Sequence, residues 1–94
     1  MEESAHKATT EEVAQWMLSS VLETGRLYQE TGVYSIRDKF GEEFTYINEN
    51  GNLAIDKNVL KAFRKISNDL VIWERGDRAW RQRADYDQPG RQQD

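Results

Sequence analysis

Eight lysine and arginine side chains are concentrated in residues 57–83, where three acidic residues accompany them, giving this segment a net charge of +5. Ammonium and guanidinium groups in such a cluster bind phosphate or carboxylate oxygens without breaking bonds. The rest of the chain is acidic, and the whole carries a net charge of −4. This asymmetry predicts an anionic partner, either nucleic acid or an acidic protein surface. The candidate nucleic-acid-binding residues are Lys57, Lys61, Arg64, Lys65, Arg75 and Arg78.

Residues suited to covalent or acid–base chemistry are scarce. The chain has no cysteine, and its single histidine, His6, lies in the polar N-terminal stretch. A Ser–His or Cys–His nucleophile and a histidine metal cluster therefore cannot be built within one chain. The adjacent carboxylates at positions 11–12 and 42–43 suit helix N-termini rather than acid–base work. We expect no catalytic activity, no cofactor and no metal.

Trp73 and Trp80 form a second candidate site, a possible interface. In a hairpin that turns at residues 75–78, these two tryptophans lie directly opposite each other. They stabilise the hairpin if their face packs on the core, but form an exposed platform if Leu70 and Ile72 face the core instead. The sequence leaves both orientations open. The alternative function is therefore protein interaction or self-association, through these aromatics and the acidic first helix.

The elements that position these residues can be predicted from spacing. Thr9 and Glu12 have the form of a capping box, so a helix should begin there, and Gly25 suits its left-handed end. Residues 26–30 are predicted to be a connector. A second helical pattern ends at Gly41. The apolar positions of the first pattern are Val13, Trp16, Met17 and Val21, and those of the second are Val33, Ile36 and Phe40.

The second half of the chain is predicted to hold a strand at residues 44–47, a type I′ turn at Asn50-Gly51 and a brief return strand at residues 53–55. Asp56 is a good N-cap for a third helix over residues 57–67. At about 100° per residue, the apolar residues of this helix share one arc and its four cations occupy the opposite arc. Residues 70–74 and 79–83 then flank a turn, which predicts a hairpin.

Length and composition predict one soluble domain. With 37% hydrophobic residues, 94 residues can bury a modest core. We place the domain at residues 9–84, with polar tails at residues 1–8 and 85–94. No apolar run is long enough to span a membrane, so we expect no membrane association and a cytoplasmic location.

The order helix, helix, short strand, helix, hairpin resembles a winged-helix-type domain. More narrowly, residues 40–46 (FGEEFTY), 48–52 (NENGN), 59–65 (VLKAFRK) and 71–75 (VIWER) are similar to a small uncharacterised bacterial family that includes products of mobile integron gene cassettes. The resemblance implies an α+β, winged-helix-like fold in which the third helix is the recognition helix and the hairpin is the wing. It implies no activity.

Overall fold

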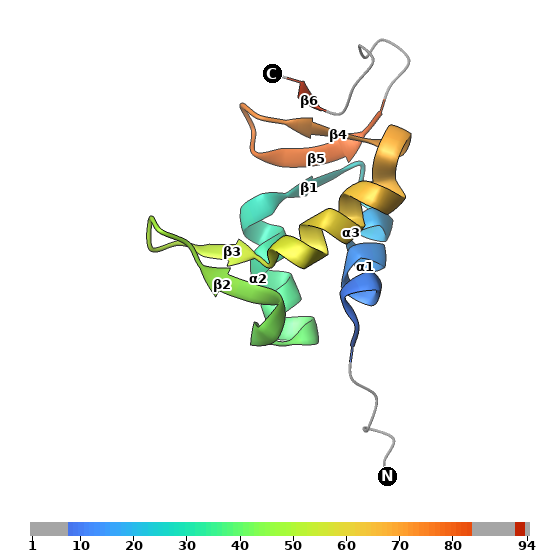
Figure 1. The fold of residues 1–94 in the computed structure, drawn as a ribbon. Coiled ribbons are helices and arrows are strands. Elements are labelled where there is room, and N and C mark those ends of the chain that lie inside the picture. The colour runs from blue at the N-terminus through green and yellow to red at the C-terminus, as the bar shows by residue number, and fades with distance from the viewer. Residues whose placement is uncertain (1–7, 84–91, 94) are drawn as a thin grey trace.

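The computed structural model describes residues 8–83 and 92–93. Within them, three helices lie on one side of a small sheet (Figure 1). The helices are α1 (Thr10–Thr24), α2 (Gln29–Phe40) and α3 (Lys57–Ser67). The sheet has the order β1-β5-β4-β6, with bounds β1 (Arg26–Tyr28), β5 (Ala79–Gln82), β4 (Val71–Glu74) and β6 (Gln92–Gln93). A separate ribbon pairs β2 (Thr45–Ile47) with β3 (Leu53–Ile55).

The predicted α+β class, with three helices and a C-terminal hairpin, is confirmed. The predicted tails and His6 lie outside the described residues, apart from Ala8 and the short strand β6. That strand pairs in parallel with β4, whereas the sequence predicted no structure there.

Helix α1 begins and ends as its capping residues predict. The Glu12 amide donates to Thr9 Oγ1 at 3.1 Å, and the Thr9 amide donates to the Glu12 carboxylate at 2.8 Å. These reciprocal bonds satisfy two amides that the helix itself leaves unpaired. At the other end Gly25 has φ 88°, a left-handed conformation that costs glycine little.

The connector predicted at residues 26–30 is wrong. Residues 26–28 form β1, which pairs antiparallel with β5 through Leu27 and Trp80, and α2 begins at Gln29. Three residues are too few to show a strand periodicity, and the partner strand lies about fifty residues later in the chain. Strand β1 forms because it can pair with the edge of β5, which is distant in sequence. The spacing of nearby residues does not reveal this pairing.

The ribbon forms, but its turn differs from the prediction. Only Gly51 has positive φ within this loop (82°), whereas a type I′ turn needs positive φ at Asn50 as well. The Gly51 amide donates to the Asn48 carbonyl at 2.9 Å, and the Asn48 side chain accepts from the Asn50 and Asn52 amides. The asparagine side chain thus organises a five-residue loop. Phe44, predicted in the strand, lies instead in a 3-10 turn before β2.

Helix α3 has the predicted bounds and the predicted two faces. The Asp56 carboxylate accepts from the Asn58 amide at 2.9 Å, which caps the helix. Val59 and Phe63 are fully buried on the core side, and Leu60, Ala62 and Ile66 pack against the core. The four cations of the helix are all exposed. Burial of the apolar arc therefore fixes the direction in which the cations point.

The hairpin has the predicted register, in which Trp73 pairs with Trp80 and Glu74 pairs with Ala79. Its loop is four residues long, Arg75 to Arg78, and the Arg78 amide donates to the Arg75 carbonyl at 3.3 Å. Positive φ falls on Arg78 (52°) rather than on Gly76. A four-residue loop keeps the cross-strand pairing of a two-residue turn, so the faces of the strands are unchanged.

The core lies between the three helices and the inner face of the sheet. Phe63 of α3 and Trp80 of β5 meet edge to face, with ring centroids 5.4 Å apart. Met17 and Val21 of α1 and Ile36 of α2 are fully buried in the same cluster. Edge-to-face aromatic packing adds to the free energy gained from burial. This cluster holds α3 against the hairpin, and so sets the position of the helix cations relative to the turn.

Candidate functional site

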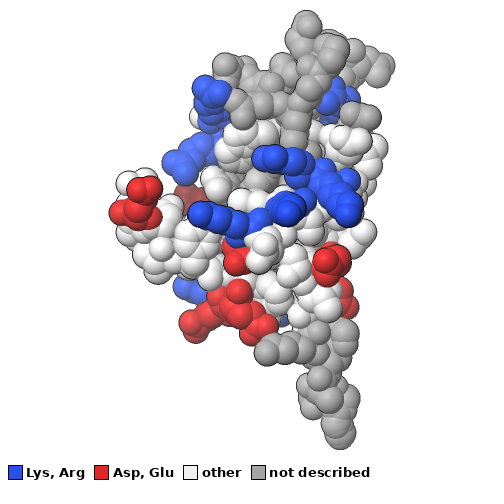
Figure 2. Space-filling model, in the orientation of Figure 1, with Lys and Arg blue, Asp and Glu red and all other residues white. Residues whose placement is uncertain are grey.

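Six exposed cations define a surface that we call the basic face. Four of them come from α3 and two from the hairpin turn. Figure 2 shows lysine and arginine side chains gathered over α3 and continuing to the hairpin tip on the same side of the molecule. All six predicted residues are exposed, and the four on α3 lie on the side of the helix opposite its buried apolar residues. The members of the basic face are Lys57, Lys61, Arg64, Lys65, Arg75 and Arg78.

The α3 cations have no carboxylate partner among the described residues. Ion pairs of the described residues lie elsewhere, among them Arg26–Asp77 at 3.0 Å, Arg37–Asp38 at 3.5 Å and Arg81–Glu74 at 2.8 Å. The first turn of α3 contains no acidic residue. Within the described residues, no ion pair therefore neutralises the four positive charges of α3.

The other two cations of residues 57–83, Arg81 and Arg83, are less exposed than those of the basic face. Arg81 pairs with Glu74 on the hairpin face opposite the tryptophans, where the two side chains are only 13% and 19% exposed. Arg83 is half-buried, and its amide donates to the Leu70 carbonyl at 2.9 Å. The eight cations of residues 57–83 are therefore divided between surfaces, because alternate strand residues point to opposite faces.

The tryptophan face of the hairpin packs on the core. Trp80 is 6% exposed, Trp73 is half-buried, and their ring centroids are 4.8 Å apart. On the other face, Leu70 is 50% exposed, and Ile72 is fully buried but is not part of the core cluster that contains Trp80. The platform of two exposed tryptophans therefore does not form. Trp16 packs edge to face on Phe40, with centroids 6.0 Å apart.

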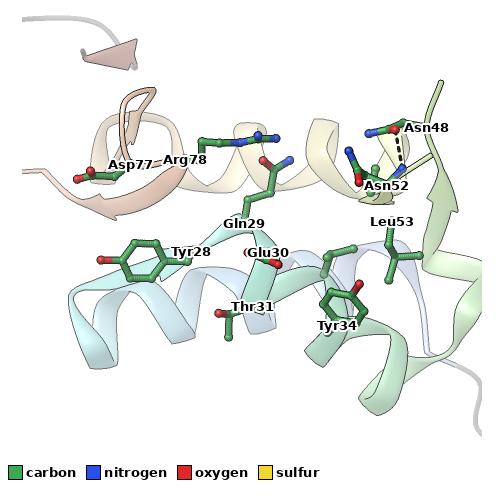
Figure 3. Close-up of a pocket in the computed structure, with 12 residues that line it drawn as sticks. Tyr28, Gln29, Glu30, Thr31, Tyr34, Asn48, Asn52, Leu53, Asp77 and Arg78 are labelled. Carbon is green, nitrogen blue, oxygen red and sulfur yellow. Dashed lines mark hydrogen bonds between the residues drawn. The ribbon is translucent and has the colours of Figure 1, made fainter. Parts of the chain in front are cut away.

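A groove of about 440 Å³ lies beside the basic face (Figure 3). Its walls are the start of α2, the β2-β3 ribbon and the hairpin turn. Figure 3 shows the Arg78 and Gln29 side chains pointing toward each other, with Asn52 and Leu53 opposite them and Tyr34 below. Arg78 therefore belongs both to the basic face and to the groove wall.

Backbone and side-chain bonds hold the groove walls together. The Gln29 amide donates to the Arg78 carbonyl at 2.9 Å, which ties the hairpin turn to the first residue of α2. Arg26 Nη1 and Asp77 Oδ2 lie 3.0 Å apart and tie the same turn to β1. The position of Arg78 is thus fixed by the bond of its own carbonyl to α2 and by the ion pair of the preceding residue, Asp77, with β1.

Sequence reasoning identified Arg78 but missed the groove. Gln29, Tyr34 and Asn52 come from segments that are distant in sequence, and they meet because β1 pairs with β5. No motif or spacing in the chain signals this meeting. The strand β1 was the missing element, and without it the start of α2 cannot be placed beside the hairpin turn.

The described residues contain no group of three or more histidine, cysteine, aspartate or glutamate side chains arranged to hold a metal ion. No helix in this part of the chain is long and apolar enough to cross a membrane. The cations of the basic face can make ionic and hydrogen-bonded contacts.

Comparison with the curated proteins and with the solved structures finds no match. Residues 9–82 match the model of a family described as a family of unknown function (DUF6953). The match includes α1, the ribbon, α3 and the hairpin, and so spans the basic face and the groove. Since it covers most of the sequence, the chain belongs to the DUF6953 family.

Proposed function

We propose that this protein is a non-catalytic binding module that binds nucleic acid through the basic face. The observation that carries the proposal is the row of four exposed α3 cations, which form no ion pair with the described carboxylates, together with lysine and arginine side chains that Figure 2 shows continuing from α3 toward the hairpin tip. A surface of this kind contacts phosphates in a row, as a nucleic-acid backbone presents them.

The spacing of the α3 cations supports an external anion. Lys57 and Lys61, like Lys61 and Lys65, are four residues apart, so neighbouring positive charges repel each other along the helix. Lys57 also lies in the first turn, where the helix dipole disfavours a cation. Both unfavourable terms are relieved when phosphate oxygens lie between the charges. Charge repulsion therefore destabilises the protein on its own, and a bound polyanion reduces this repulsion.

The acidic residues outside the basic segment would direct a negatively charged partner to one part of the surface. Residues 1–56 carry a net charge of −7. In Figure 2 the acidic side chains gather mostly below α3 and at the tip of the ribbon. Such a field repels a polyanion from the acidic parts of this face and favours approach at the basic face.

The order of elements also supports the proposal. In a winged-helix-type domain, the third helix and the terminal hairpin are the elements that contact nucleic acid. Here α3 and the β4-β5 turn supply all six cations of the basic face. We include in the proposal that the domain is of the winged-helix type, with β4-β5 as its wing and an origin among bacterial integron cassettes.

The alternative, protein interaction or self-association through the hairpin tryptophans and the acidic first helix, has less support. It requires Trp73 and Trp80 to be available at the surface, and Trp80 is 6% exposed. No other observation on the hairpin favours it, so nucleic acid remains the proposed partner.

Fluorescence anisotropy of a labelled oligonucleotide tests the proposal. Replacing Lys61, Arg64 and Arg78 together with glutamate should abolish binding, because three phosphate contacts become repulsive. A matched pair of single variants controls for net charge. Lys61→Glu should weaken binding, whereas Lys39→Glu makes the same charge change on α2 and should leave it unchanged. Equal effects of the two single variants, or full binding by the triple variant, would refute the proposal.

A further inference from the structure

The groove beside the basic face differs from it in charge. Two carboxylates, Glu30 and Asp77, line it together with the single cation Arg78. Because Arg26 pairs with Asp77 at 3.0 Å, the remaining charges of Glu30 and Arg78 offset each other, and the groove offers a phosphate no net attraction. The groove suits a neutral group that can donate hydrogen bonds, such as the amino edge of a nucleobase.

Several polar side chains of the groove are available for a ligand. Within the described part of the chain, no hydrogen bond engages the side chains of Gln29, Glu30 or Asn52. These groups supply amide donors and both amide and carboxylate acceptors. The side-chain oxygen of Asn48 (Oδ1), in contrast, already accepts from two loop amides. The free groups lie on both walls, so a ligand between the walls can contact more than one of them.

The groove also offers an aromatic surface. Tyr34 is 44% exposed, and its ring points into the space seen in Figure 3. The Arg37 guanidinium lies 5.0 Å from the ring centroid and steadies the ring. Val33 and Leu53 add apolar surface next to it. A volume of about 440 Å³ is within the range of small-ligand sites.

Arg78 connects the two surfaces and is held in an unfavourable conformation. Its φ of 52° lies in the left-handed region, which glycine would adopt more readily. Strained non-glycine residues of this kind recur at functional sites. Its side chain points along the groove wall while its residue belongs to the hairpin tip. A nucleic-acid strand that lies along the basic face therefore reaches the groove at Arg78.

We propose that the groove receives an unstacked base of a single-stranded nucleic acid, stacked on Tyr34 and hydrogen-bonded by Gln29 and Asn52, while its backbone follows the basic face. This inference rests on the proposed function and names the form of its ligand. In a duplex the bases are already stacked and paired, so they cannot enter the groove. The protein should therefore prefer single strands to duplexes.

Anisotropy titrations of the full chain test this inference with a labelled single strand and a duplex of the same length at one salt concentration. The wild-type protein should bind the single strand several-fold more tightly. Tyr34→Leu should lower single-strand affinity roughly tenfold, as loss of one stacked base does, and leave duplex affinity unchanged. Tyr34→Phe is the matched control, since it keeps the ring and should keep the preference.

The outcomes separate this inference from the proposed function. Equal affinity for the two ligands, or equal effects of Tyr34→Leu and Tyr34→Phe, would overturn the groove as a base site while leaving the basic face in place. Such a result would also be expected if the groove binds a peptide. Loss of single-strand preference in Tyr34→Leu, together with loss of all binding in the triple glutamate variant, would support both. Absence of binding to either ligand by the wild-type protein would overturn both.

Discussion

At the scale of single residues, Arg78 contributes in two opposing ways. Its left-handed backbone, with φ 52°, weakens the hairpin turn. Its side chain lines the groove and points toward the side chain of Gln29 (Figure 3). A residue that costs stability and reaches a candidate ligand site is expected where function and stability compete.

Replacing Arg78 with glycine should therefore change stability and binding in opposite directions. We expect Arg78→Gly to raise the free energy of unfolding by about 1 kcal/mol, because glycine adopts positive φ without the steric cost of a Cβ atom. The same variant should bind nucleic acid more weakly. Urea denaturation and anisotropy measure the two effects. Arg78→Lys keeps the charge and the Cβ atom and serves as the control. If Arg78→Gly has a lower free energy of unfolding than Arg78→Lys, this account is contradicted.

At the scale of elements, α3 has an apolar face whose burial stabilises the fold and a charged face on which neighbouring cations repel each other. Its buried arc packs on the core through Val59 and Phe63, while its cations repel each other at four-residue spacing. The helix persists because burial of large side chains contributes more than surface repulsion costs.

Lys61 lies at the centre of this repulsion, four residues from both Lys57 and Lys65. Lys61→Glu should stabilise the fold by about 0.5 kcal/mol, since two repulsive pairs become attractive. The gain should shrink at high salt because screening weakens both kinds of pair. Thermal unfolding at two salt concentrations measures it. A loss of stability in this variant would show that Lys61 makes a favourable contact that the structure does not contain.

Phe63 is the contact through which α3 holds the hairpin. It is fully buried and packs edge to face on Trp80. Phe63→Ala should lower the free energy of unfolding by about 3–5 kcal/mol, the usual cost of such a cavity, and should unfold much of the protein at moderate temperature. Tryptophan fluorescence during urea denaturation reports the change. If Phe63→Ala lowers the free energy of unfolding no more than a substitution at an exposed position such as Leu22→Ala, the packing described here is contradicted.

The contrast between α3 and β1 shows which elements could be predicted from sequence. Helix α3 and the hairpin were predicted correctly because their caps, periodicity and cross-strand pairing are local. Strand β1 was missed because three residues, Arg26 to Tyr28, carry no periodic signal and depend on β5 for pairing. The loop at Asn48 was predicted with the wrong turn because a side chain, rather than backbone geometry alone, organises it.

At the scale of the whole molecule, the basic face could be predicted in part and the groove could not. The helix cations follow from one amphipathic pattern, but their placement beside the hairpin turn requires the Phe63–Trp80 contact. The groove requires three segments to meet through β1, which no local pattern specifies. The net charge of −4 likewise conceals one positive surface, because charge is distributed by the fold rather than by composition.

The salt dependence of single-strand binding tests the central claim most directly. For a surface that neutralises phosphates, the logarithm of the association constant falls with the logarithm of salt concentration by about 0.7 for each phosphate contacted. We predict a steep slope for the wild-type protein and a slope shallower by about 0.7 in Lys61→Ala, with no change in Lys39→Ala. Binding that is insensitive to salt, or a slope that Lys61→Ala leaves unchanged, would contradict the claim that the basic face binds a nucleic-acid backbone.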